Sequence, residues 1–467
     1  MLYLVGMPQA DLSMERIFKT WWPLAASWLL MGAELPVIAA VMARLADPKI
    51  SLAAYGGVVF PLALMIEAPI IMLLAASTAL SKDMDSYLLV RRFMMVTSAI
   101  LTALHLIIAL TPLYYLVVQG LIGAPLEIVE PARIGFIILT PWTWSIAYRR
   151  FNQGVLIRFG HSETVGIGTV IRLLADAAAL IIGYLIGGVP GIVVGASAVS
   201  AGVISEAIYS GIVVRPVVNK QLRSEPPLAQ PLTWRAFFDF YIPLAMTSLI
   251  FLLAQPIGSA AISRMPNALA SLAVWPVVSG LVFMFRSPGV AYNEVVVALM
   301  DRPRSYTVLR RFTNWLALLT FFALLLVTAT PISTWWFERV SALSSDLAEL
   351  ARISLWLALP LPVMSVLQSW YQGSLLHGRR TRGITEAVVL YLVSIALLLA
   401  AGVAWGQVAG LYVGVAAMSV SMTLQTIWLS VRSRPVLNTV RARDMQVPTA
   451  LASTSDEVAA GYNLSAD

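Results

Sequence analysis

About twelve long apolar segments, each nearly free of charge, follow one another along this sequence, and Ala99–Leu110 is a clear example. A membrane-spanning helix needs roughly 20 apolar residues, whereas an ordinary soluble domain is about 25% charged. Here 59% of the 467 residues are hydrophobic and 12% are charged. The strands of a membrane barrel would alternate in polarity, which these runs do not. We therefore expect an all-α polytopic membrane protein with twelve transmembrane helices.

The apolar segments fall into two groups of six. The first six helices are expected at 20–45, 52–80, 91–118, 130–157, 163–187 and 190–215, and the second six at 235–264, 269–299, 308–337, 348–377, 382–404 and 407–432. A polar linker with three prolines at 218–233 separates an N-lobe at 20–217 from a C-lobe at 234–436. Residues 1–19 are expected to be a cytoplasmic N-terminus. The polar residues 437–467 are expected to be a disordered cytoplasmic tail.

Lysine and arginine are distributed unevenly between alternate loops. One side of the membrane, counted with both termini, carries 23 of them, including the pairs Arg91–Arg92 and Arg149–Arg150. The other side carries six, which are Arg44, Lys49, Arg133, Arg264, Arg339 and Arg352. Because cytoplasmic loops carry the excess of positive charge, we expect both termini in the cytoplasm and the protein in the inner membrane. The net charge of +7 then reflects topology, and no nucleic-acid partner is expected.

The two halves are related by an internal repeat. Arg44 returns as Arg264 at a shift of 220, and Pro141 returns as Pro360 at a shift of 219. Other matches at these shifts are Pro36 with Pro256, Gln153-Gly154 with Gln372-Gly373, and Gly191 with Gly410. Both halves begin on the same side, so the repeat is parallel and its axis should lie along the membrane normal. Proline within a span kinks the helix, so Pro141 and Pro360 are expected to interrupt the fourth and tenth helices.

The residues that the sequence lacks limit its chemistry. Cysteine is absent, which excludes disulfides and thiolate metal sites. The three histidines, His105, His161 and His377, are scattered, so no metal site is expected, and no glycine-rich phosphate-binding loop is present. His105 lies within a span, where both a hydrogen-bonded core position and a proton-carrying role are open. We expect neither an enzyme nor a cofactor beyond a coupling ion.

This architecture resembles the multidrug and toxic compound extrusion (MATE) family of a larger flippase superfamily. Some stretches look closer to its progressive ankylosis protein branch, namely Trp22-Pro23-Leu24, Leu52-Ala53-Ala54-Tyr55-Gly56, Ser81-Lys82-Asp83 and Gln153-Gly154-Val155-Leu156. The resemblance covers about residues 15–436. It implies two lobes around a central cavity, and alternating access driven by Na⁺ or H⁺. It also implies organic cations, other amphipathic solutes or, in the ankylosis branch, organic anions and phosphate compounds as substrates.

Ionisable residues inside spans are costly and therefore mark candidate sites. Glu34 and Asp176 match the acidic pair that forms the N-lobe cation site in the resembled family. Arg172 replaces the neutral amide that usually precedes the second acid by one turn, and this departure argues against Na⁺ because a guanidinium can occupy the place that a cation would take. A salt bridge from Arg172 to Asp176, at i,i+4, or to Glu34 is the structural alternative.

Three further intramembrane charges are candidates for the substrate cavity. Glu67 and Arg286 occupy equivalent repeat positions at a shift of 219, so they could pair across the cavity or contact substrate. Glu206 lies deep in the sixth helix and is a weaker candidate. Glu386 is close to Arg379, Arg380 and Arg382 and is more simply part of loop electrostatics.

Taken together, the sequence predicts a monomeric secondary active transporter that exports a small organic solute across the bilayer. Coupling to H⁺ or Na⁺ antiport is expected. A lipid-linked-precursor flippase and an exporter of organic anions or phosphate compounds remain alternatives on the same fold. A flippase would need a strongly basic cavity for a pyrophosphate headgroup, and only Arg172 and Arg286 are expected as intramembrane cations.

Overall fold

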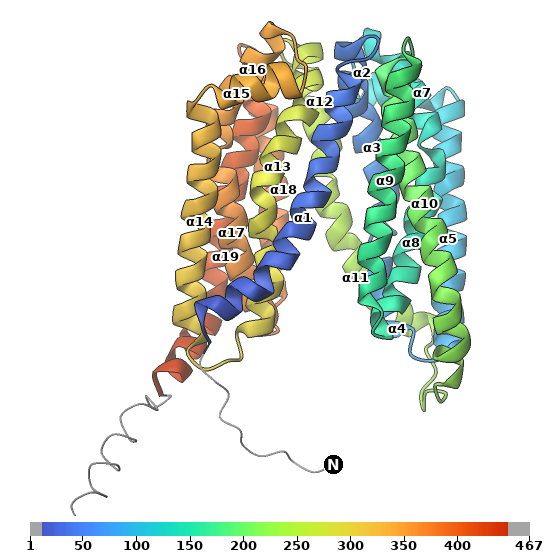
Figure 1. The fold of residues 1–467 in the computed structure, drawn as a ribbon, viewed down its shortest axis with the longest axis vertical. Helices are drawn as coiled ribbons and strands as arrows, with labels where there is room; N and C mark the ends of the chain where they lie inside the picture. Colours follow the sequence, from blue (N-terminus) through green and yellow to red (C-terminus); the bar gives the residue numbers. More distant parts are fainter. Residues whose placement is uncertain (1–11, 447–467) are drawn as a thin grey trace, which may run out of the picture.

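A computed structural model describes residues 12–446, which form two helical bundles that meet at one end and diverge at the other (Figure 1). The first half contains α1 (Met14–Met42), α2 (Pro48–Ala54), η1 (Tyr55–Val59), α3 (Phe60–Glu67), α4 (Leu73–Leu80), α5 (Met84–Leu110), α6 (Leu113–Tyr115), η2 (Leu116–Ile122), α7 (Leu126–Ile138), α8 (Thr140–Arg158), α9 (Ser162–Ile186) and α10 (Gly191–Lys220). The second contains α11 (Trp234–Leu252), α12 (Ala254–Ser263), α13 (Ala268–Leu299), α14 (Ser305–Ala329), α15 (Ile332–Thr334), η4 (Trp335–Val340), α16 (Ser345–Ala358), α17 (Pro360–His377), α18 (Arg382–Trp405) and α19 (Gly410–Gln446). The short 3₁₀ helix η3 (Leu222–Ser224) lies between them.

Eleven helical segments of the described chain are long and apolar enough to cross a membrane. Helices α7 and α8 supply the twelfth span. This span is less apolar because α8 buries polar side chains, among them Arg149, Asn152 and Gln153. The predicted all-α architecture with twelve transmembrane helices is therefore confirmed.

The internal repeat extends to irregularities in the helices. Each half has a π-helix at the same place, η2 after α6 and η4 after α15. The chain also breaks before Pro141 in α8 and before Pro360 in α17, as predicted, because proline cannot donate the backbone hydrogen bond that continues a helix. The halves differ elsewhere, since α3 ends at Glu67 whereas its counterpart α13 runs unbroken.

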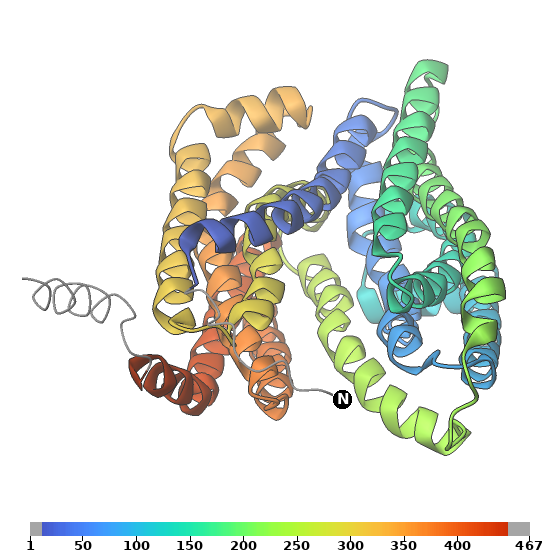
Figure 2. The same cartoon turned by 60° about the horizontal axis from the view of Figure 1, so that its bottom comes forward.

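The first span of each half crosses toward the other bundle, as Figure 2 shows for α1 and α11. Near the start of α1, the Trp21 indole Nε1 donates a 2.9 Å hydrogen bond to the carbonyl of Pro288 in α13. Near the start of α11, the Tyr241 hydroxyl donates a 2.6 Å hydrogen bond to the carbonyl of Pro69 in the first half. The sequence lobes at 20–217 and 234–436 therefore describe the repeat, while α1 and α11 bridge the two bundles.

Two arginines tie the bundles together at the end where they meet. Arg264 follows α12 and donates hydrogen bonds of 2.7 Å to the carbonyls of Leu121 and Ile122, the last residues of η2. Its repeat counterpart Arg44 follows α1 and donates to the carbonyls of the last two residues of η4, at 2.5 and 2.8 Å. A cation is favourable at the carbonyl end of a helix. We refer to Arg44 and Arg264 as the outer arginine clamps.

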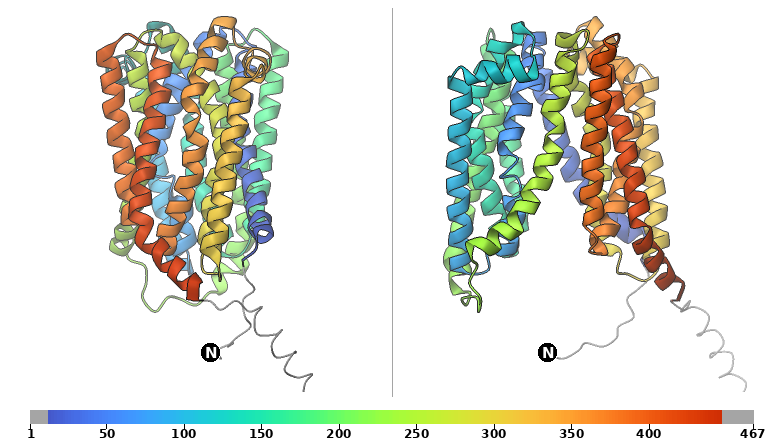
Figure 3. Two further views of the ribbon diagram at one scale, coloured as in Figure 1. Left: turned by 90° about the vertical axis from the view of Figure 1, so that its left-hand side faces the viewer. Right: turned by 180° about the vertical axis from the view of Figure 1, so that it is seen from behind.

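The start of α1, the linker and the end of α19 all lie at the diverging end (Figure 3). The linker is held there by Asp83, whose carboxylate accepts hydrogen bonds of 2.9 Å from the amides of Ser86 and Leu228. Partial burial raises the pKa of Asp83, but these hydrogen bonds outweigh it and hold the pKa below its ordinary value.

The predicted disordered tail is wrong for its first ten residues. Helix α19 continues to Gln446, and Arg443 donates hydrogen bonds of 3.0 Å to the carbonyls of Met300 and Arg302 in the loop before α14. Val440 packs against the core beside that loop, which explains why the helix persists beyond the membrane. The remainder of the predicted tail, 447–467, lies outside the described residues.

Candidate functional site

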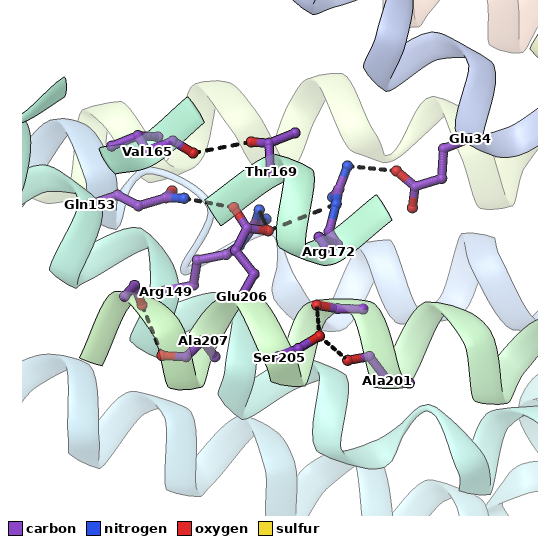
Figure 4. Close-up of polar contacts among 12 residues, drawn as sticks. Glu34, Arg149, Gln153, Val165, Thr169, Arg172, Ala201, Ser205, Glu206 and Ala207 are labelled. Carbon is purple, nitrogen blue, oxygen red and sulfur yellow. Dashed lines mark hydrogen bonds and ion pairs between the residues drawn. The ribbon is translucent and has the colours of Figure 1, made fainter. Parts of the chain in front are cut away.

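Four helices bring buried charged side chains into one continuous set of contacts (Figure 4). Arg172 of α9 donates through Nη2 to Glu34 Oε2 of α1 at 2.5 Å, and its Nε lies 3.8 Å from Glu206 Oε2 of α10. The same Glu206 oxygen accepts from Arg149 Nη1 of α8 at 2.5 Å, while Gln153 Nε2 donates to Glu206 Oε1 at 2.9 Å. We refer to Glu34, Arg149, Gln153, Arg172 and Glu206 as the N-lobe cluster.

Asp176 completes this site from the next turn of α9 and lies beside Glu34. It packs against Gly202 of α10, where a Cβ atom would lie only 1.8 Å from Asp176 Oδ1, so only glycine leaves room for the carboxylate. Neither oxygen of Asp176 has a hydrogen-bond donor among the described residues. The buried Tyr55 hydroxyl, also without a partner there, lies near both Glu34 and Asp176.

The structure thus brings together the predicted trio of Glu34, Arg172 and Asp176, with a different bonding pattern. The possible i,i+4 bridge from Arg172 to Asp176 is not formed. Arg172 instead reaches Glu34, the other bridge that the sequence left open, and approaches Glu206. Asp176, like Glu67, therefore makes no direct ion pair with an arginine of the described residues.

Sequence reasoning missed Arg149 and Arg150 by assigning both to the cytoplasmic loops. The structure places both within α8, where Arg149 is buried at 6% exposure and Arg150 is partly buried. A signal was present, because both positions fall inside the helix expected at 130–157. Gln153 also lies four residues after Arg149, on the same helical face. The loop asymmetry in basic residues persists without this pair.

The charges of the site do not balance. Its carboxyl groups are Glu34, Glu67, Asp176 and Glu206, and its guanidinium groups are Arg149, Arg150 and Arg172. Four carboxylates and three guanidinium ions carry one net negative charge when all are ionised. An uncompensated charge inside a membrane protein is costly, and one further positive charge would balance these seven groups.

The three predicted cavity residues have separate environments. Glu206 is fully buried at the centre of the N-lobe cluster, so it cannot contact a solute in this conformation. Glu67 is 3% exposed and lies near Arg149 and Arg150. Arg286 forms no ion pair with Glu67 or with any other carboxylate in residues 12–446, and pairing in another conformation stays a prediction.

The second half carries a neutral copy of the N-lobe cluster. At the shift of 219, Arg149 corresponds to Gln368 and Glu206 to Gln425, and the two glutamine side chains share a 3.1 Å hydrogen bond from Nε2 to Oε1. Arg172 corresponds to Tyr391. Asp176 and Glu34 correspond to the apolar residues Ile395 and, at the shift of 220, Ala254. At these repeat positions, uncharged residues of the second half replace the charged groups of the first.

An apolar groove of about 480 Å³ lies between α1 and α9. Its walls include Val37 and Val41 of α1 and Ala177 and Leu180 of α9. These residues follow Glu34 and Asp176 directly along their helices. Glu34 and Asp176 themselves do not line the groove.

Two other titratable groups, Glu386 and His105, lie outside this site and form hydrogen bonds with their own neighbours. Glu386 accepts hydrogen bonds from Arg382 and Arg432 at the end of α18, which agrees with the reading as loop electrostatics. The His105 ring bonds to Thr143 and to the carbonyl of Phe136, and it stacks on the Phe136 ring at 3.9 Å. Of its two readings, this geometry favours the hydrogen-bonded core position.

No protein-family model matches the chain, and no curated protein matches it. Solved structures do share its fold. An inward-facing multidrug resistance MATE family transporter of the MOP superfamily aligns with a TM-score of 0.63 at 16% identity, covering 89% of this chain and 99% of its own. The lipid II flippase MurJ, in an inward closed conformation, aligns at 0.67 and 15% identity, covering 91% of each chain.

A third similar structure is a MOP superfamily transporter from Pyrococcus furiosus, described as having a binding pocket of reverse polarity that suggests a different function. Its TM-score is 0.57 at 18% identity, with 92% of this chain and 97% of that chain covered. These similarities confirm the fold implied by the resemblance to the MATE family. They do not distinguish the progressive ankylosis branch, which stays a prediction.

Proposed function

We propose that this protein is a monomeric secondary transporter that exports a small organic solute from the cytoplasm by alternating access, in exchange for protons. The charge imbalance of the site in the first half carries this proposal. A group of four carboxylates and three guanidinium ions is neutral only when it holds one added cation. We further propose that both termini lie in the cytoplasm of an inner-membrane protein, in keeping with the excess of basic residues at the diverging end.

The added cation is proposed to bind between Glu34 and Asp176. Asp176 has no donor for either oxygen, and Glu34 is its neighbouring carboxyl group. A single proton shared by the two acids would remove the unbalanced charge. The Tyr55 hydroxyl nearby is available to donate to the remaining carboxylate oxygens.

A proton suits this geometry better than Na⁺. A hard metal cation takes several oxygen ligands, and membrane transporters commonly supply them from unwound helix backbone. Helices α9 and α10 are continuous, so their backbone carbonyls are engaged in helical hydrogen bonds. In α1, Pro36 frees only the carbonyl of Gly32, which is fewer backbone ligands than an unwound helix supplies. The guanidinium of Arg172 also occupies one Glu34 oxygen.

The site is placed to influence the opening of the bundles. Glu34 lies on α1, whose first half packs against α13, while Arg172 lies on α9 within the other bundle. Protonation of Glu34 would weaken its contact with Arg172 and thereby loosen α1 from α9. This supplies a physical link between proton binding and the relative movement of the two bundles.

The experiment is solute transport in proteoliposomes under imposed H⁺ and Na⁺ gradients. Wild-type protein is expected to transport when a pH gradient is applied, and Glu34→Gln and Asp176→Asn to lose this response while remaining folded. Glu386→Gln is the matched control, because it removes a carboxylate that pairs with Arg382 and Arg432 outside the site. Folding is checked by size-exclusion chromatography and thermal unfolding.

Proton-driven transport at the wild-type rate by both folded variants would refute the coupling site. Loss of folding instead would support the purely structural salt bridge, since removing one partner of a buried pair commonly costs about 3–5 kcal/mol. Transport that responds only to a Na⁺ gradient would show that the coupling ion is Na⁺ and not H⁺.

A flippase for lipid-linked precursors is the second candidate, favoured by the similarity in fold to MurJ. Recognition of a pyrophosphate headgroup needs several available cations. Arg149 and Arg172 are committed to ion pairs, and Arg150 is buried in the same group. This arrangement supports a smaller solute over a pyrophosphate-linked lipid.

A further inference from the structure

We infer that Arg286 of α13 binds an anionic group of the transported solute, so that the substrate class is organic monoanions such as carboxylates or sulfonates. This inference deepens the proposed transport function and rests on it. It identifies a solute site in the second half that is separate from the coupling site in the first half.

The charge of Arg286 is uncompensated. Its Nε donates a 2.9 Å hydrogen bond to Ser365 Oγ of α17, and its two terminal nitrogens make no hydrogen bond within residues 12–446. A guanidinium ion has five N–H donors in a planar fork, so most of its donors remain available. Every arginine of the N-lobe cluster, by contrast, has a carboxylate partner.

The position of Arg286 makes this charge expensive without a ligand. It lies near the middle of α13, which packs against α17 of its own bundle and against α1. A cation inside an apolar membrane-spanning helix is costly unless a partner compensates its charge. The side chain is only partly accessible, so solvent supplies little compensation.

The surroundings of Arg286 fit the anionic end of a small organic molecule. The Ser365 hydroxyl accepts from Arg286 Nε and has a proton of its own to donate, and Tyr391 of α18 lies in the neighbourhood of the guanidinium. The Tyr391 ring stacks near Phe251 of α11 at 6.3 Å, which provides an aromatic wall next to the charge. A bidentate guanidinium–oxyanion contact bounded by aromatic rings recognises an anion attached to an apolar body.

The repeat strengthens the argument for a single anion. The residue equivalent to Arg286 in the first half is Glu67, which lies beside Arg149 and Arg150. The residues equivalent to those two arginines are the uncharged Gln368 and Ser369. The second half therefore has a cation where the first has an anion, and it has no charged residues at the positions that face that anion in the first half. An external anion would take the place that a carboxylate side chain takes in the first half.

The test is equilibrium binding to the full-length protein in nanodiscs, by isothermal titration calorimetry, with two probes of similar shape. Naphthalene-1-sulfonate carries an anion, and (naphthalen-1-ylmethyl)trimethylammonium carries a cation. We expect saturable binding of the sulfonate, and a loss of at least about tenfold in affinity in Arg286→Gln, because a charge-assisted hydrogen bond is removed. Arg286→Lys retains the charge and should retain part of the affinity.

The matched control is Arg215→Gln, the same substitution at an exposed arginine of α10. Unchanged sulfonate binding in Arg286→Gln, binding of the ammonium probe alone, or no saturable sulfonate binding to the wild type would each overturn the inference. Complete displacement of the sulfonate by sodium chloride at equal concentration would identify an inorganic-anion site, and the substrate assignment would fail. Binding needs no gradient, so failure of proton coupling in proteoliposomes would be recognised separately.

Discussion

Removal of the outer arginine clamps should open the end at which the two bundles meet. Arg44 and Arg264 each donate two short hydrogen bonds to carbonyls at the end of a π-helix in the opposite half. Both side chains are exposed, so each bond is taken at about 1 kcal/mol net. Substitution of either arginine by alanine should therefore weaken closure by about 2 kcal/mol.

The double variant should lose about 4 kcal/mol, because the clamps share no partner and distant effects add. Since 1.4 kcal/mol corresponds to a factor of ten, the ratio of closed to open molecules should fall roughly 30-fold in each single variant and roughly 10³-fold in the double variant. A protein whose closed form is favoured at this end by less than about 4 kcal/mol would become mostly open there.

The chain contains no cysteine, so spin labels can be attached at introduced cysteines without a background. Glu127→Cys and Asp346→Cys place labels at exposed, repeat-equivalent positions near the joined ends of the bundles. Lys82→Cys and Asp301→Cys form the corresponding pair at the diverging end. In the double clamp variant, pulsed electron–electron double resonance should report longer distances between the labels at the joined end and shorter distances between the labels at the diverging end.

Arg133→Ala is the control for this experiment. Arg133 also lies at the joined end, but it donates to the carbonyl of Ala109 at 2.9 Å and to the Tyr115 hydroxyl at 2.9 Å, both within its own half. It should therefore leave the distances between bundles unchanged. If the double clamp variant is folded and both distance distributions match the wild type, the hydrogen bonds do not hold this end closed and the reasoning is wrong.

Two other predictions concern packing and topology. A Cβ atom at Gly56 would lie 2.6 Å from Pro276 Cδ of the opposite half, so Gly56→Ala should lengthen the same label distance at the joined end; Gly166→Ala, where nothing lies within 4 Å, should not. Identical distances in both alanine variants would contradict this close-packing argument. A cysteine at Ser224 should react with an impermeant reagent only from the cytoplasm and one at Gly188 only from outside, and reversed labelling would invert the proposed orientation.

The spans were predictable from the sequence because apolarity over a membrane thickness is a strong local signal. The crossing of α1 and α11 was not, since the repeat positions Trp22-Pro23 and Ile242-Pro243 look the same whichever bundle the helix contacts. The prediction that residues 437–446 are disordered was wrong for a related reason. Helical residues 437–446 are polar, and their order depends on tertiary contacts such as those of Arg443 with the loop before α14.

The candidate site was recovered in part for a physical reason. Glu34 and Asp176 stand out because acids are rare in apolar spans, and the structure brings them together. Arg149 was assigned to a loop because basic residues near span ends usually mark topology. Its role depends on pairing with Glu206, which lies 57 residues later in the chain, and no local pattern specifies such a contact.

The two halves are alike in their arginine clamps and differ in their buried polar groups. Arg44 and Arg264 remain the same residue type and make the same contact in both directions, as expected where two bundles close against each other about a pseudo-twofold axis. The buried polar groups differ between the halves, since Arg149 and Glu206 form an ion pair where Gln368 and Gln425 share a neutral hydrogen bond. Under the proposed function, one proton would bind near Asp176 and one solute anion would bind at Arg286 in the other half. Proton binding would then act on the solute through the movement of α1, without competition for the same side chain.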